Sequence, residues 1–433
     1  MLPDVVSYQE EQRIWLVRAS GGKHFQNFLK HDVVAISHID KLIGLSASKE
    51  IPAPEAISDF LYAEAKLMVT LAAEHVVAWR RDEDSISGEH WDEDGHEDPE
   101  NKMSAANRES QVSKFINDFK IGDLIVTINS THIAIGYCVS DVYVDETVLV
   151  NRIYRDRKEP KIELLEYKLR RNVSWGDPIP RDLVSLSLRK PLLARNTVSS
   201  LDEHWDKVYT LAYPIFVRDG MVYFSNRINR QGPIGTRSMC VVLDSIVCAQ
   251  LVADAIFTGL NPDVALSDLL SSDCYDSDFE ERLMSQAEVM SPGYLHHKIR
   301  CLAGVSSERY AAMLMLLMSI GLSGCEADTQ NLKVRAANLI SSFQQDDMSK
   351  ERSAVVVGAL ESDEMLQDFQ TIMKNKGVAK VASNLRMAPG NAVGALPPKK
   401  PAVKSKAGGG RVSPPSAPES VSAQAVQFKL NLE

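Results

Sequence analysis

Two short apolar runs on either side of a glycine pair constrain the fold of this chain most. Ile14–Val17 forms the first run, Gly21 and Gly22 follow it, and Val33–Ile36 forms the second. Residues 25–29, between the glycines and the second run, place two phenylalanines and a leucine at helical spacing. Short apolar runs predict strands and a glycine pair predicts a turn. We therefore expect a strand, a glycine turn, a short helix and a strand.

The chain is too long for one ordinary hydrophobic core, since 433 residues favour two or three domains. Hydrophobic content of 44% with 24% charged residues is typical of a soluble globular protein. We expect an α+β protein with a recognition domain at 1–200 and a second domain at 201–384. Residues 385–433, rich in Pro, Gly, Ala, Ser and Lys, predict a disordered linker that ends in a peptide motif.

Residues 54–118 predict a helical insertion in the first domain. Apolar residues recur at close to helical period over 54–81, and a second helical pattern covers 112–119. Between them, residues 82–100 hold ten Asp/Glu and no Lys/Arg, which equals the whole net charge of −10. The rest of the chain is balanced, so the acidic total does not exclude nucleic-acid binding. The spacing within this acidic segment does not match a calcium-binding loop, and we expect a solvated segment.

The six cysteines form no C-x-x-C pair and no metal-finger spacing. Free thiols in a reducing compartment are the simpler interpretation. Acidic residues at Asp4, Glu10 and Glu11 stand where a signal peptide needs a basic and then an apolar run. We expect a cytoplasmic protein with no catalytic residues, no metal and no cofactor.

Three separate pieces of the first 200 residues share a pattern with one known family. The first piece has a tryptophan strand, a basic residue, a glycine pair, an aromatic turn and an "AI" pair: Trp15, Arg18, Gly21, Gly22, Phe25, Phe28, Ala35 and Ile36. The second is a "GD" hairpin over 119–136, and the third is an R-x-V-x-W … I-P-R element over 170–181. Together they resemble the PUA-like/EVE-like domain at the N-terminus of Mrr-type restriction and other prokaryotic defence proteins, over roughly 13–200.

That resemblance implies a small curved β-barrel that binds nucleic acid, often through a modified base held between aromatic walls. It implies a ligand-binding site formed by Trp15, Arg18, Gly21, Gly22, Lys23 and Trp175. It also implies a sensor or specificity component of phage defence, with an effector encoded nearby as a partner. The alternative for each tryptophan is a place in the core.

The densest basic run of the chain's folded part predicts contacts with nucleic-acid phosphates. Its residues are Arg152, Arg155, Arg157, Lys158, Lys168, Arg170 and Arg171, interleaved with tyrosines. The alternative is an exposed strand whose cations block edge pairing. A further alternative is a Mg-dependent nuclease that uses the E-x-K of Glu166 and Lys168 with Asp141 or Asp145 upstream.

The second domain predicts a β-hairpin followed by a mainly α-helical body. Asp219 and Gly220 suit a type I′ turn between 209–217 and 221–225. Helical patterns follow at 239–260, 264–270, 279–289, 309–322, 332–343, 348–360 and 363–377. Charges interrupt 239–260, and 311–322 is short for a membrane span, so we expect no stable membrane insertion. A membrane-acting effector gated by the first domain is the alternative from another class.

The extreme C-terminus resembles the Q-L-x-L-x-L peptide that docks on the bacterial DNA sliding clamp. The matching residues are Gln427, Phe428, Leu430 and Leu432, with Phe428 departing from the pattern. Such a peptide can be held at a partner by pocket contacts and by the effective concentration that a linker provides. A tail strand that adds to the protein's own sheet explains the alternation equally well.

Overall fold

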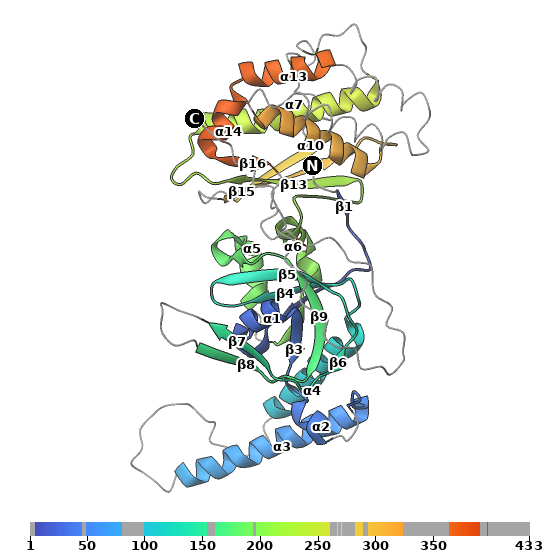
Figure 1. Cartoon of the computed structure of the whole chain (residues 1–433), viewed down its shortest axis with the longest axis vertical. Coiled ribbons are helices and arrows are strands. Elements are labelled where there is room, and N and C mark those ends of the chain that lie inside the picture. The colour runs from blue at the N-terminus through green and yellow to red at the C-terminus, as the bar shows by residue number, and fades with distance from the viewer. Residues whose placement is uncertain are drawn as a thin grey trace. The chain divides into compact units, whose positions relative to one another are not determined.

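The computed structural model describes residues 5–45, 49–79, 99–153, 161–193, 196–259, 282–288, 293–323 and 363–389, with Leu266, Leu270 and Leu396. All of them belong to one unit, Met1–Lys399. The fold is α+β, as expected. It contains a curled half-barrel sheet, a second sheet and several helices (Figure 1).

The opening of the half-barrel follows the sequence pattern closely. Strand β2 (Ile14–Val17) is followed by the turn η1 (Ala19–Gly22), helix α1 (Phe25–His31) and strand β3 (Val33–Ile36). The predicted order of strand, glycine turn, short helix and strand is confirmed. Asp32 caps the C-terminus of α1 in the left-handed conformation, and β3 begins at the next residue.

The half-barrel sheet has the strand order β11-β2-β4-β5-β9-β3, with β10 on β5 and β6 on β9. The further strands are β4 (Leu124–Ile128), β5 (His132–Cys138), β6 (Tyr143–Val144), β9 (Leu169–Trp175), β10 (Ile179–Pro180) and β11 (Val198–Ser200). β2 and β4 run parallel, and the other pairs are antiparallel. Alternate residues of β2 enter two different cores, because both faces of this sheet are covered.

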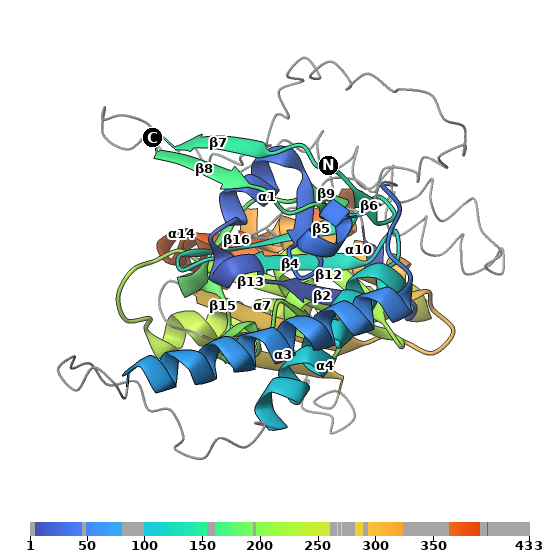
Figure 2. The ribbon, with the colours of Figure 1, turned by 90° about the horizontal axis from the view of Figure 1, so that it is seen from below.

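A helical insertion joins β3 to β4, as predicted. It comprises α2 (Asp40–Leu45), α3 (Pro54–Trp79), α4 (Pro99–Ser113) and the π-helical turn η2 (Lys114–Asp118). A separate two-stranded hairpin, β7 (Leu149–Ile153) and β8 (Lys161–Leu165), lies beside α1 (Figure 2). Short helical turns follow β10: η3 (Arg181–Leu183), α5 (Leu186–Arg189), η4 (Pro191–Leu193) and, after β11, η5 (Asp202–His204).

The second sheet has the order β1-β12-β13-β15-β14, with β16 also paired to β13. Its strands are β1 (Val6–Ser7), β12 (Ile215–Arg218), β13 (Met221–Ile228), β14 (Leu283–Glu288), β15 (Gly293–Arg300) and β16 (Met387–Pro389). β1 pairs in parallel with β12, so Val6 lies opposite Phe216. The first strand of the chain therefore belongs to the second sheet.

This sheet corrects the expectation of a mainly α-helical second half. The predicted turn is confirmed, since Asp219 and Gly220 have φ values of 50° and 70°. Residues 209–212, however, belong to helix α6 (Trp205–Ala212), and the helix predicted at 279–289 is wrong where β14 runs. In β14 and β15 alternate residues face the core, as Leu295 and Ile299 do. The sequence does not show this strand alternation clearly, because polar residues stand between the apolar ones.

Helices cover one face of the second sheet (Figure 1). They are α7 (Thr236–Thr258), α10 (Ser307–Ser323), α13 (Asp363–Asn375) and α14 (Val378–Leu385). Three of the predicted helices are confirmed by α7, α10 and α13. The helices predicted at 332–343 and 348–360 lie outside the described residues, as does most of 264–270.

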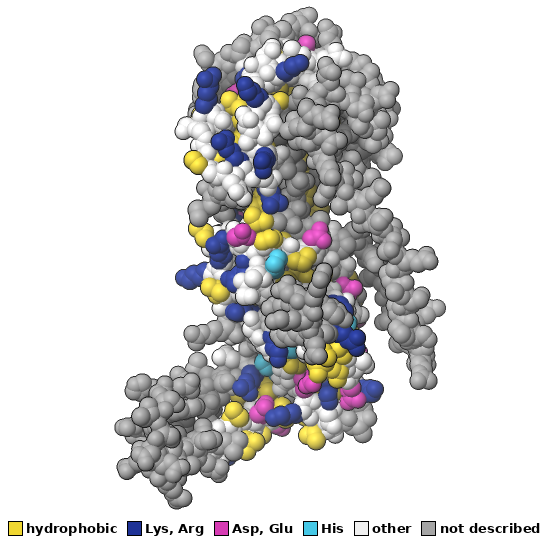
Figure 3. Space-filling view, turned by 60° about the vertical axis from the view of Figure 1, so that its left-hand side comes forward, with side chains coloured by type: hydrophobic (Ala, Val, Ile, Leu, Met, Phe, Trp, Pro, Cys, Tyr) yellow, Lys and Arg dark blue, Asp and Glu magenta, His cyan; other side chains and the backbone are white. Residues whose placement is uncertain are grey.

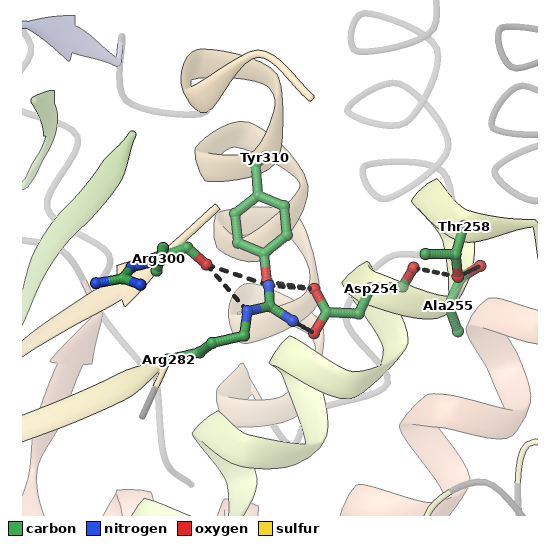
Figure 4. Close-up of polar contacts among 6 residues, drawn as sticks. All are labelled: Asp254, Ala255, Thr258, Arg282, Arg300 and Tyr310. Carbon is green, nitrogen blue, oxygen red and sulfur yellow. Dashed lines mark hydrogen bonds and ion pairs between the residues drawn. The ribbon is translucent and has the colours of Figure 1, made fainter. Parts of the chain in front are cut away.

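A partly buried polar cluster ties α7, α10 and the start of β14 together (Figure 4). Arg282 donates two hydrogen bonds to the Asp254 carboxylate, at 2.7 and 3.0 Å, and the Tyr310 hydroxyl donates a third at 2.7 Å. Arg282 also donates to the carbonyl of Arg300 at 3.1 Å from Nη2. Every strong polar group of the cluster therefore has a partner, and its geometry is that of a structural clamp.

Candidate functional site

The turn between β2 and α1 has an unusual backbone. Ser20, Gly21 and Gly22 have φ values of 47°, 64° and 91°, so three successive residues are left-handed. A Cβ on Gly22 would lie 2.3 Å from the carbonyl oxygen of Ile128, so this residue has to be glycine. Ser20 adopts the same region with a side chain, which costs conformational energy and is common at ligand-binding turns.

The turn is held by Tyr167, in the segment between β8 and β9. Its hydroxyl is hydrogen-bonded to the Ser20 hydroxyl, and its ring meets the His24 ring edge to face, with centroids 4.7 Å apart. His24 is buried, and burial is the main cause that lowers its imidazole pKa. At neutral pH this ring is therefore uncharged, with one nitrogen a donor and the other an acceptor.

Asn27, one helical turn after His24, is the most anomalous residue of the half-barrel. Its side chain is 0% exposed, and neither amide atom has a hydrogen-bond partner among the described residues. Nδ1 of His24 is buried and unpartnered in the same way. Such groups are rare in folded proteins, because each forfeits its hydrogen bonds to water, and a bound molecule or water is the usual explanation.

Helix α1, which begins after His24 and carries Asn27, contacts both strands of the β7–β8 hairpin. His31, one turn beyond Asn27 on the same side of α1, has Nε2 3.3 Å from the carbonyl oxygen of Val150 in β7. Glu163 and Glu166 are close enough to His24 to act on its pKa, against the effect of burial. The neighbourhood is therefore polar and holds charges of both signs, since Lys23 also acts on the pKa of His24.

Trp175 is fixed at the other end of α1. Its indole nitrogen donates to the carbonyl oxygen of Phe28 at 2.9 Å, and its ring lies against Gly136, where an added Cβ would come within 2.8 Å of the ring. The ring is partly exposed. Trp175 is therefore a rigid aromatic group beside the helix that carries Asn27.

Trp15, by contrast, is a core residue. It is 1% exposed, its ring stacks on Phe119 and its indole nitrogen donates to Asp123 at 2.9 Å. This corrects the expectation that it lines a ligand site, because it has no open face. Arg18 is partly buried next to β11, and Lys23 is exposed on the turn.

Arg170 and Arg171 are also structural, which corrects their place in the predicted phosphate surface. Both are almost fully buried. Arg170 forms an ion pair with Asp145 at 3.0 Å, and Arg171 donates to the carbonyl oxygens of Phe115 and Ile116 at 2.9 Å each. A guanidinium group that is committed in this way does not reach a phosphate.

The remaining predicted cations divide into two groups. Arg152 is exposed on β7, and the ammonium group of Lys168 lies 3.8 Å from Glu146. Arg155, Arg157 and Lys158 lie outside the described residues, as do Gln427, Phe428, Leu430 and Leu432 of the clamp-like peptide.

The nuclease alternative gains no support from the described residues. Glu166 and Lys168 lie in the segment between two strands, and Asp145 is already paired with Arg170. Within the described ranges no three metal-ligating side chains come together. The membrane alternative rests on α7, which is long and apolar enough to span a bilayer, but 56% of its apolar window is buried inside the protein.

Asp40, at the start of α2, provides a pH-dependent prediction. Burial raises the pKa of its carboxyl group to about 6, while its Oδ1 accepts a hydrogen bond from the Lys168 backbone at 3.0 Å. The folded chain thus binds this proton more tightly than the unfolded chain, whose carboxyl has a pKa of about 3.9. The contribution of Asp40 to stability therefore falls as the pH rises from about 4 to about 6.

The variant Asp40→Asn keeps the acceptor and cannot ionise. Relative to the parent, its free energy of unfolding is expected to rise across this pH window and to stay higher at pH 7. Urea denaturation at pH 4, 5, 6 and 7 measures the difference. A difference that does not change with pH would contradict the prediction.

Ser20, His24 and Asn27 were not predicted from the sequence as site residues, and Tyr167 was predicted only as a tyrosine interleaved with the basic run. The available signal was two polar residues, His24 and Asn27, each directly before a buried phenylalanine, Phe25 and Phe28. Comparison of the chain with family models, curated proteins and solved structures finds no match. What the half-barrel binds must therefore be inferred from its own side chains.

Proposed function

We propose that the half-barrel binds the base of a nucleic acid or nucleotide between α1, the segment around Tyr167 and the β7–β8 hairpin. The observation that carries this proposal is the fully buried amide of Asn27, which has no hydrogen-bond partner among the described residues, near the buried, neutral His24. An amide offers donors and an acceptor together, which matches the mixed donor and acceptor edge of a base.

The aromatic groups nearby suit the same ligand. Unstacked bases are recognised by stacking on aromatic rings and by hydrogen bonds to their edges. Tyr167 and Trp175 are both partly exposed and held by hydrogen bonds, so they can provide a ring face at little entropic cost. Lys23, exposed on the glycine turn, can meet the phosphate that follows the base.

We further propose that the half-barrel is a PUA-like/EVE-like domain. This is supported by the three motif matches, which fall on β2 to β3, β4 to β5 and β9 to β10 of one sheet. A role as a sensor in phage defence follows from this resemblance alone.

The test replaces Asn27 by leucine, which has a similar volume and no polar atoms. Because a buried amide without partners costs about 1–3 kcal/mol, the variant is expected to melt at a higher temperature than the parent. If the amide holds a base, the same variant loses ligand binding. A gain in stability together with a loss of binding distinguishes a site residue from a core residue.

Binding is measured by fluorescence anisotropy with labelled single-stranded DNA and RNA that carry each base and its methylated forms. Asn117→Leu, on the exposed face of η2, is the control and should change neither property. Unaltered base binding by the Asn27→Leu protein would remove the amide from the proposal.

A further inference from the structure

Two segments that are distant in the sequence share a basic charge pattern. Residues 226–243 contain three arginines and residues 374–389 contain three lysines and one arginine, and neither segment contains an Asp or a Glu. In a chain with net charge −10, two such segments are unusual. The first spans the end of β13 and the start of α7, and the second spans the end of α13, α14 and β16.

The fold brings these two segments side by side. The backbone nitrogen of Arg230 donates to the carbonyl oxygen of Leu385 at 3.1 Å, and the amide of Asn229 donates to that of Arg386 at 3.0 Å. β16 pairs with the end of β13, and α14 packs against α7. The Lys376 ammonium group reaches Asp244 on α7 at 2.9 Å.

The cations of this surface point to solvent. Four of them are exposed: Arg237, Lys374, Lys380 and Arg386. Figure 3 shows Lys and Arg side chains gathered over the upper part of the view, with few acidic side chains among them. We call these four residues, together with Arg230, the basic face. The acidic neighbour Asp244 is already neutralised by its ion pair with Lys376.

We infer that the basic face binds the phosphate backbone of nucleic acid without regard to sequence. Exposed Lys and Arg groups that lie close together repel one another, and phosphates relieve that repulsion while releasing counterions. Among the described residues the exposed large hydrophobic side chains include one aromatic ring, Tyr62 on α3, so the basic face provides charge and no base recognition. This separates it from the half-barrel site, and the inference does not rest on the function proposed there.

Nucleic acid is favoured over an anionic membrane by the surroundings of the cations. A membrane-binding surface usually combines cations with exposed large apolar side chains that enter the interface. The exposed large hydrophobic residues of the described chain lie elsewhere: on α2 and α3, in the loops at Ile121, Val139 and Val148, on the β7–β8 hairpin, on α5 and η4, and at Met284 on β14. The sequence after Pro389 continues without an acidic residue to Pro418 and adds further lysines.

The experiment uses the full chain and a labelled 20-base-pair duplex of arbitrary sequence, with affinity measured from 50 to 200 mM salt. The variant Arg237→Gln/Lys374→Gln/Lys380→Gln/Arg386→Gln is compared with the parent. The slope of log affinity against log salt should shrink by roughly 0.9 for each lost phosphate contact, so by up to about 3.6. The matched control, Lys41→Gln/Lys49→Gln/Lys66→Gln/Lys120→Gln, removes as many exposed cations from the half-barrel side and should keep the parental slope.

Circular dichroism melting checks that each variant folds, and two double variants, Arg237/Arg386 and Lys374/Lys380, replace the quadruple variant if it does not. Each double variant should show about half of the decrease in slope that is expected for the quadruple variant. Asn27→Leu should leave duplex binding unchanged, so failure of the half-barrel proposal is seen separately. Equal slopes for parent and quadruple variant, no duplex binding by the parent, or binding to phosphatidylserine vesicles in place of DNA would each overturn the inference.

Discussion

Replacing Asp254 by alanine is expected to destabilise the protein by about 3–5 kcal/mol, because it breaks a largely buried ion pair by removing one partner. The change leaves the Arg282 guanidinium without its carboxylate. It also leaves the hydroxyl of Tyr310 unpaired at a position with no exposed surface. The midpoint of urea unfolding, followed by circular dichroism, measures the loss.

Asp244→Ala is the matched control for this prediction. Asp244 lies on the same helix, α7, and also forms an ion pair, with Lys376 at 2.9 Å, but its side chain is half exposed. Surface pairs of this kind contribute about 0–1 kcal/mol. If the two alanine variants unfold at the same urea concentration, the Asp254 cluster is not the clamp that its geometry indicates.

The second large effect is expected for Arg171→Ala. Arg171 crosses from β9 to the end of the helical insertion, where it donates to Phe115, Ile116 and, at 3.2 Å, Ser140 carbonyl oxygens. Carbonyl groups at the end of a helix have no partner within the helix, so a cation that binds them is stabilising. Removing it leaves buried acceptors unpaired and a cavity in the core, and we expect a loss of about 3–5 kcal/mol.

Arg189→Ala tests whether this loss depends on burial. Arg189 also donates to two carbonyl oxygens, those of Val184 and Asp182, at 3.0 Å each, but it is partly exposed. Water can replace it there, so the expected loss is about 1 kcal/mol or less. Chemical unfolding of the two variants in parallel gives the comparison, and similar losses would contradict a buried structural role for Arg171.

The half-barrel was predictable where local pattern and final environment agree. β2 and β3 are apolar throughout, and β4 is apolar except for Thr127; a strand that is covered on both faces is typically a nearly continuous apolar run. The helix predicted over 54–81 was equally clear, since its period extends over several turns. Strands β14 and β15 were not predictable in the same way, because β15 is placed by pairing with β13, which is distant in sequence, and β14 by pairing with β15.

The residues of the candidate site also divide into those that could be predicted from the sequence and those that could not. Gly22 could be identified from its place in a glycine pair, and Trp175 from its motif. Asn27 could not, because its importance lies in lacking partners, and no sequence pattern shows which buried amides remain unpaired. Trp15, Arg170 and Arg171 were predicted as binding residues because their side chains suit a ligand. Only the fold shows that their donors are already hydrogen-bonded within the protein, to Asp123, to Asp145 and to three carbonyl groups respectively.

The parallel pairing of β1 with β12 has a consequence for how the chain is made. About 200 residues of half-barrel and insertion separate the two strands. During translation β1 therefore emerges from the ribosome before β12 and stays unpaired until β12 has emerged. A fragment that begins at residue 201 would lack β1 and would expose one edge of β12, where another copy could add. The second sheet is thus expected to fold after the half-barrel, and to be complete only in a chain that includes β1.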